Sequence, residues 1–214
     1  MNERQRRQRE RGRLIDRHTI QFERILPGPI ELAWDYLTKK EYLAGWLLDD
    51  DIPSTPGASI ALSQDSERVP MRVPGEIRGE ILRVSPPHIL AFTWENVRPG
   101  EADDDHPSPG PASMRSSERS SERSSERSEV VFELESLPHT RGSEEGRQVR
   151  LILTHRRVEP HHIPGSGAGW HTHLEYLSCK LNAKSPPPNF FAMYEEVLPY
   201  YVRACLQMQR LRDN

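Results

Sequence analysis

The hydrophobic pattern of the chain begins with alternation and ends with helical spacing. Ile20 and Phe22 are separated by polar residues within residues 17–26, and this alternation predicts an opening strand. Apolar side chains in residues 29–37 recur every three or four positions, which indicates a short helix. Residues 38–45 suit a second short helix that ends at a glycine. The chain is therefore expected to start with one strand and two short helices.

Strand patterns dominate the middle of the chain. Further short or alternating apolar runs cover residues 58–62, 76–84, 88–95, 129–135 and 148–155. Because turns join consecutive runs, the strands should pair antiparallel. Gly79 lies inside one run, where a glycine fits a bend or a bulge in a strongly curved sheet.

Helical spacing returns near the C-terminus. The apolar stripe of one helix consists of Trp170, His173, Leu174, Leu177 and Leu181. The glycine-rich residues 165–169 are expected to form a hinge in front of this helix. A final helix over residues 190–210 contains Pro199, which should kink it or split it in two.

These elements together predict an α+β fold. A curved sheet with one apolar face needs a cover, and the stripe within residues 170–181 supplies it. We expect a curved antiparallel sheet of six to seven strands wrapped around a long C-terminal helix, with the two short helices after the first strand.

The domain organisation follows from the polar segments. We expect a basic disordered or frayed tail at 1–16, one domain at 17–185, and a helical extension at 186–214 that packs on the domain. Residues 97–128 should be a disordered insertion, since they contain an Arg-Ser-Ser-Glu repeat and no apolar face. The repeat suits either a DNA repeat expansion or an Arg/Ser segment that contacts RNA or is phosphorylated.

Charge and composition narrow the choice of partners. The 214-residue chain has a net charge of −3, so the whole chain lacks the excess of positive charge that is typical of nucleic-acid-binding proteins. No apolar run is long enough to span a bilayer, and the N-terminus lacks the apolar core of a secretory signal. Cys179 and Cys205 are too few for a disulfide framework. We expect a cytoplasmic protein, a monomer or homodimer, that binds neither nucleic acid nor membrane.

Four local patterns, in order, resemble one known family. They are the opening strand and paired helices with Trp34 and Trp46, then GEIRGEILRVSPP, HILAFTWE and GWHTHLEYLSCKL. Over roughly residues 17–181, apart from the insertion, the chain is similar to the Hsp90-ATPase-activator-homologue-like (AHSA1-like) group of the SRPBCC, START or Bet v 1-like superfamily. This resemblance implies a helix-grip fold with a cavity between sheet and helix. It implies no catalytic residue, because the family has no universal ones.

Candidate chemistry is sparse. His171 and His173 open a helix, where positions two apart point about 200° from each other, so they cannot share a metal. Asp49, Asp50 and Asp51 suit a solvated acidic turn better than a cation site. The glycines before Trp170 could bind an anion at a helix start, although a flexible hinge is the preferred interpretation. We predict no metal, no cofactor and no catalytic residue.

The remaining candidate site is the gap between sheet and helix. The residues expected to line it are Trp46, Phe92, Trp94, Trp170, His173 and Tyr176. They could equally fill a packed core. We favour a module that binds a small hydrophobic molecule; the alternatives are a co-chaperone type of protein-interaction module and a cavity enzyme such as a cyclase or hydrolase.

Overall fold

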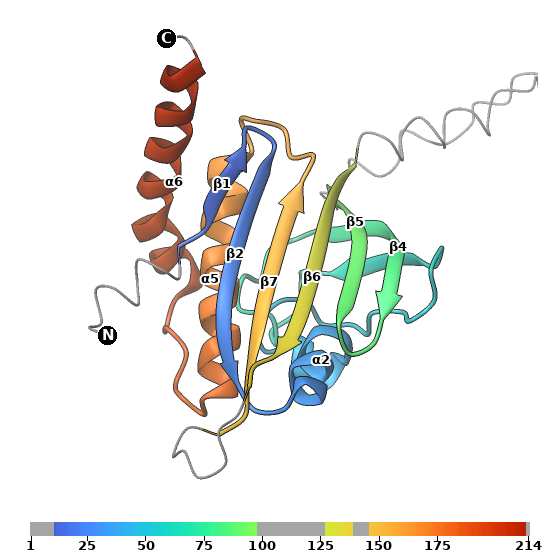
Figure 1. Cartoon of the computed structure of the whole chain (residues 1–214). Coiled ribbons are helices and arrows are strands. Elements are labelled where there is room, and N and C mark those ends of the chain that lie inside the picture. The colour runs from blue at the N-terminus through green and yellow to red at the C-terminus, as the bar shows by residue number, and fades with distance from the viewer. Residues whose placement is uncertain (1–10, 98–126, 139–145, 213–214) are drawn as a thin grey trace, which may run out of the picture.

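The computed structural model describes residues 11–97, 127–138 and 146–212 of the chain (Figure 1). Its strands are β1 (Arg13–Asp16), β2 (Thr19–Pro27), β3 (Ser59–Ser63), β4 (Glu76–Ser85), β5 (Ile89–Val97), β6 (Ser128–Ser136) and β7 (Gln148–Arg156). Its helices are α2 (Ile30–Thr38), α3 (Lys40–Leu43), α5 (Ile163–Leu181) and α6 (Phe190–Arg212). The prediction for the insertion at 97–128 lies almost wholly outside the described residues.

The strands form one seven-stranded antiparallel sheet in the order β1-β2-β7-β6-β5-β4-β3. Strand register explains why one face is apolar. Phe22, Leu153, Phe132 and Leu90 are consecutive partners across β2, β7, β6 and β5, and all four are buried. Because alternate residues of a strand face the same side, the period-of-two pattern of each strand lines one common core.

The sheet curves strongly at β4 and β5. A Cβ on Gly79 would lie 1.9 Å from the backbone oxygen of Thr93, so only glycine allows this approach. The register shifts between Ile81 and Arg83 mark a bulge in the same pair of strands. The expected bend or bulge is therefore confirmed, and it brings β3 and β4 around the core.

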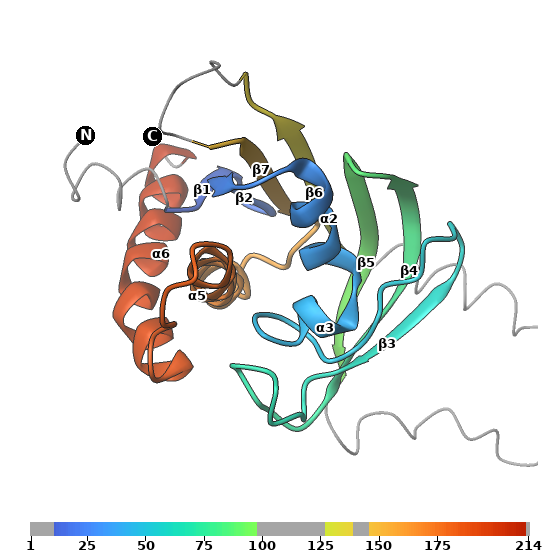
Figure 2. The same ribbon diagram turned by 90° about the horizontal axis from the view of Figure 1, so that it is seen from below.

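The helices occupy the concave side of the sheet (Figure 2). Helix α5 packs against β2, and α2 lies against β6 and β7. Helix α6 packs on the outer side of α5. This arrangement is the α+β fold that the hydrophobic pattern predicts and the helix-grip fold that the family resemblance implies, with seven strands and two short helices after β2. Of the described helices, none is long and apolar enough to cross a membrane.

Three local expectations need correction. Residues 13–16, placed in a tail, form β1 and pair with β2. Helix α5 begins at Ile163 rather than after a glycine hinge; Pro164 suits its first turn. Gly167 faces Tyr201, whose ring would lie 2.7 Å from an added Cβ, so a glycine belongs inside this helix. Pro199 does not split the last helix, because α6 continues through it.

Candidate functional site

An aromatic layer lies between the sheet and α5. Trp94 from β5, Phe132 from β6, His155 from β7 and Trp170 from α5 contact one another, with ring centroids 5.1–6.3 Å apart. Register places them there, because Trp94 pairs with Ser128 and Val130 pairs with His155 on neighbouring strands. The alternation of β7 puts His155 on the same face as its apolar neighbours.

A chain of hydrogen bonds runs through this layer. The Trp170 Nε1–H donates to His155 Nδ1 at 3.0 Å. An indole nitrogen can only donate, so Nδ1 is the acceptor and His155 carries its proton on Nε2. Nε2 then donates to Ser128 Oγ at 2.9 Å, and Ser128 Oγ donates to the Trp94 carbonyl at 2.8 Å. Each of these groups has a defined direction of donation.

Burial fixes the charge of His155 as well. The imidazole is almost fully removed from water, which lowers its pKa from 6.5 to about 3. His155 is therefore neutral near pH 7, with both nitrogens bonded. It orients Trp170 and Ser128, and it has no free lone pair for a substrate proton.

Trp94 is the accessible member of the layer. Its side chain is only half-buried, whereas Phe92, Phe132 and Trp170 are buried. It lies near the end of β5, and its indole packs on Trp170 with a centroid distance of 5.1 Å.

The other predicted lining residues divide into two groups. Trp46 is fully buried; it contacts Phe132 and donates from Nε1 to the Tyr36 carbonyl at 2.9 Å. His173 Nδ1 donates to the Trp46 carbonyl at 2.6 Å, so these two residues fasten α5 to the segment after α3. Burial lowers the pKa of His173 to about 4. Tyr176 instead belongs to the α5–α6 contact, since its hydroxyl donates to the Pro187 carbonyl at 2.6 Å.

The structure thus brings Phe92, Trp94 and Trp170 together and assigns Trp46, His173 and Tyr176 to packing contacts. The sequence reasoning missed the roles of His155 and Ser128. Alternation along residues 148–155 did place His155 on the inner face. Its partners could not be found, since Ser128 and Trp170 are respectively 27 and 15 positions away.

His171 points away from His173, as the helical spacing indicates. Its Nδ1 lies 3.0 Å from the Tyr201 hydroxyl of α6, and that oxygen also accepts from the Gly12 backbone N–H at 3.1 Å. The Tyr201 hydroxyl therefore hydrogen-bonds both His171 and the Gly12 backbone. Burial and the nearby Arg24 and Arg11 charges lower the pKa of His171 to about 3. Among the described residues, no three His, Cys, Asp or Glu side chains are grouped as metal ligands would be.

The acidic turn is more than a solvated loop. Asp49 is only 14% exposed; its carboxylate accepts from Ser66 at 2.5 Å and from Arg68 at 3.0 Å. Asp51 accepts from the backbone N–H of Lys40 at 2.8 Å. These bonds hold residues 64–69 against α3, so the turn has a structural role.

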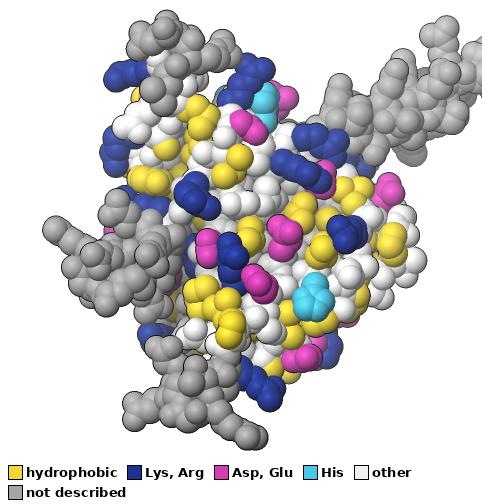
Figure 3. All heavy atoms as spheres, in the orientation of Figure 1, with side chains coloured by type: hydrophobic (Ala, Val, Ile, Leu, Met, Phe, Trp, Pro, Cys, Tyr) yellow, Lys and Arg dark blue, Asp and Glu magenta, His cyan; other side chains and the backbone are white. Residues whose placement is uncertain are grey.

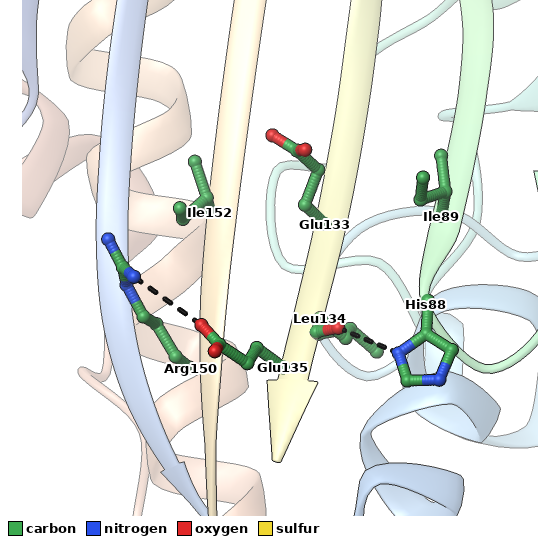
Figure 4. Close-up of a pocket in the computed structure, with 7 residues that line it drawn as sticks. All are labelled: His88, Ile89, Glu133, Leu134, Glu135, Arg150 and Ile152. Atoms are coloured by element: carbon green, nitrogen blue, oxygen red, sulfur yellow. Dashed lines mark hydrogen bonds and ion pairs between the residues drawn. The ribbon is translucent and has the colours of Figure 1, made fainter. Parts of the chain in front are cut away.

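The outer, convex face of the sheet carries a shallow pocket (Figure 4). Glu133 lies there between Ile89 and Ile152, its register partners on β5 and β7. Arg150 donates to Glu23 at 2.9 Å and to Glu135 at 3.4 Å. Acidic, basic and apolar side chains are mixed over this face (Figure 3), so it presents no surface of one chemical kind.

The sheet and the helix that it grips define the class of protein. The chain is an α+β protein with the helix-grip fold, and its residues 27–181 match the family described as activator of Hsp90 ATPase homolog 1-like protein. The chain belongs to this family.

Several solved structures are similar to this chain. A protein from Bordetella parapertussis, studied by solution NMR, is 31% identical with a TM-score of 0.59, and the match covers 87% of this chain and 86% of that one. CalU16 from Micromonospora echinospora is 19% identical with a TM-score of 0.56 over 87% and 88%. A protein of unknown function from Enterococcus faecalis is 14% identical with a TM-score of 0.53 over 90% of each chain. The last two matches show the fold alone. Among proteins with curated descriptions, none matches significantly.

Proposed function

We propose that this protein binds a small hydrophobic molecule with an aromatic ring, and that the ligand packs on Trp94 at the edge of the sheet–α5 interface. The observation that supports this is the half-buried Trp94 indole beside the buried Trp170. A tryptophan that keeps one side accessible next to an apolar interior offers a flat surface for stacking.

The geometry favours binding over catalysis. General acid–base work needs a titratable group with a free position and a pKa near the working pH. His155 has both nitrogens bonded and a pKa lowered to about 3. Ser128 donates its hydroxyl proton to the Trp94 carbonyl, so no base activates it as a nucleophile.

The chemistry around Trp94 also limits the ligand. The rings that contact this indole are Phe92, Trp170 and neutral His155. Burying apolar area here contributes about 2.5 kcal/mol for each ~100 Å² removed from water. A neutral, largely apolar ligand is therefore preferred to a charged one.

Trp34 provides a matched control for a binding experiment, because it is also a half-buried tryptophan but lies on α2. We would titrate the full chain and the Trp94→Ala and Trp34→Ala variants with the neutral fluorescent probe N-phenyl-1-naphthylamine. We expect Trp94→Ala to weaken binding about tenfold, since an aromatic contact contributes on the order of 1 kcal/mol beyond buried area. Trp34→Ala should bind like the unchanged chain. Equal binding by all three proteins, or none, would contradict the proposal.

A second candidate is a co-chaperone type of interaction, which the family description favours. It requires a stable apolar surface rather than an accessible interior. The test is the ATPase rate of Hsp90 with and without the full chain. A rate increase that Trp94→Ala leaves unchanged would support the co-chaperone role over ligand binding.

A further inference from the structure

Helix α6 has two apolar stripes, and only one of them is covered. The covered stripe contains Phe190 and Tyr201, whose rings pack against His173 and Tyr176 and over Gly167 of α5. The second stripe, which we call the outer stripe, consists of Phe191, Leu198, Val202 and Leu206. These four positions recur at helical spacing, on the side of α6 turned about 100° from the covered stripe.

The outer stripe is unusually exposed. Phe191, Val202 and Leu206 keep 46%, 40% and 48% of their surface accessible, while Leu198 is half-buried. In the described part of the chain, six large hydrophobic residues are exposed, and these three share one helix face. The other three lie singly on β1, β2 and β4. A row of this kind marks a contact surface, whereas single exposed residues are ordinary.

Beside the outer stripe, acidic residues lie in the first half of α6 and basic residues lie in the second half. Glu195 and Glu196 are the charged residues of positions 190–200, and the basic Arg203 and Arg210 follow in the second half. At about 100° per residue, all four lie on or beside the same edge of the stripe. None of the four forms an ion pair with another described residue.

From this arrangement we infer that the outer stripe binds the outer stripe of a second copy of this chain, with the two α6 helices antiparallel. In an antiparallel helix pair, equal edges face each other, so the acidic half of each helix meets the basic half of its partner. With the two-fold axis near Leu198, Phe191 lies opposite Leu206 and Glu195 lies opposite Arg203. A parallel pair would place this charged edge opposite the other edge of the partner helix, so the acidic and basic halves would not meet.

The described part of the chain leaves the outer stripe uncovered. Figures 1 and 2 show α6 at the margin of the molecule, with α5 on one side of it. Arg11, the first described residue, lies 4.5 Å from the ring centroid of Tyr200, on the side of α6 away from the outer stripe. Residues 1–10 contain Met1 as their only hydrophobic residue, so they could not fill an apolar groove.

Sedimentation equilibrium of the full chain tests the inference. We expect a dimer with a dissociation constant in the micromolar range. Leu206→Glu should give a monomer, and Ile25→Glu should not; Ile25 is the matched control because both side chains are 48% exposed. Circular dichroism of each variant verifies that it is folded. A monomeric unchanged chain throughout the micromolar range, or a dimer that survives Leu206→Glu, would overturn the inference.

Charge exchange tests the orientation separately. Glu195→Arg and Arg203→Glu should each weaken the dimer about tenfold, because every dimer contains two such pairs. The double variant restores opposite charges across the interface and should recover the affinity of the unchanged chain. If the double variant is weaker than both single variants, the helices do not pair antiparallel in this register. The result does not depend on ligand binding, since Trp94 is not part of the outer stripe.

Discussion

His155 shows how a single buried polar residue can be stable inside an apolar layer. An imidazole that loses water must have its nitrogens paired, and Trp170 and Ser128 supply one donor and one acceptor. The partners also determine the tautomer, because Trp170 can only donate. The group serves as a neutral connector between β6, β7 and α5.

Removing the Ser128 hydroxyl, which accepts the hydrogen bond from His155, should lower the free energy of unfolding. Ser128→Ala leaves the Nε2–H of His155 without its acceptor, and an unsatisfied buried donor costs about 1–3 kcal/mol. Urea unfolding would show this as a lower free energy of unfolding. Ser59→Ala, at an exposed position of β3, is the control and should change the free energy by less than about 0.5 kcal/mol.

Three histidines should make the fold sensitive to acid. The folded pKa values of His155 and His171 are about 3 and that of His173 is about 4, all below the ordinary 6.5. Between pH 6.5 and 4 the unfolded chain binds more protons than the folded chain, so stability falls as the pH falls. Each histidine contributes up to about 1.4 kcal/mol per pH unit in that window.

Urea unfolding at several pH values measures that slope. His155→Phe should remove one histidine from it, so its free energy of unfolding should vary less steeply with pH whatever its value at pH 7. An unchanged slope in His155→Phe would mean that His155 is protonated in the folded protein.

Elements meet closely where side chains are absent. Helix α5 carries glycines at 165, 167 and 169, and the structure gives them different surroundings. Gly167 faces the Tyr201 ring of α6, whereas an added Cβ on Gly169 has nothing within 4 Å. Helix α6 can approach α5 closely at position 167 because a glycine there leaves room for the Tyr201 ring.

Alanine at these two positions should have opposite effects. Gly167→Ala places a methyl group 2.7 Å from the Tyr201 ring and should destabilise the protein by about 1–3 kcal/mol through overpacking. Gly169→Ala has room and should stabilise the helix by about 0.5–1 kcal/mol. Thermal unfolding of both variants gives the comparison. Equal destabilisation by both would argue against the close contact between the helices.

At the scale of the whole molecule, the two ends of the described chain are tied together. The Tyr201 hydroxyl of α6 accepts from the Gly12 backbone and hydrogen-bonds His171 of α5. Burial raises the pKa of Tyr201, so the hydroxyl stays protonated. The phenol ring also packs near Phe22 of β2. One residue thus connects the N-terminal segment, the sheet and both C-terminal helices.

Tyr201→Phe should loosen this connection without removing the ring. The Gly12 N–H loses its acceptor, and we expect faster amide exchange at Gly12 and along β1. Amides of β6 and β7 should exchange at the original rate and serve as an internal control. Unchanged protection at Gly12 would show that β1 holds its place without Tyr201.

The sequence by itself determined the periodic features of this protein. Alternation and helical spacing, which depend only on near neighbours, give the main strands, α2, α3, most of α5 and the inner-face position of His155. Strand β1 was missed because its four residues, RLID, hold too few apolar positions to show a period.

Only the tertiary structure decided which distant groups meet. The pairing of His155 with Ser128 and Trp170, the contact of Tyr176 with Pro187 and the approach of Tyr201 to Gly167 join separate elements. Local periodicity gives the face on which a residue lies. It does not give the partner opposite, because that depends on register, sheet curvature and helix packing over the whole chain.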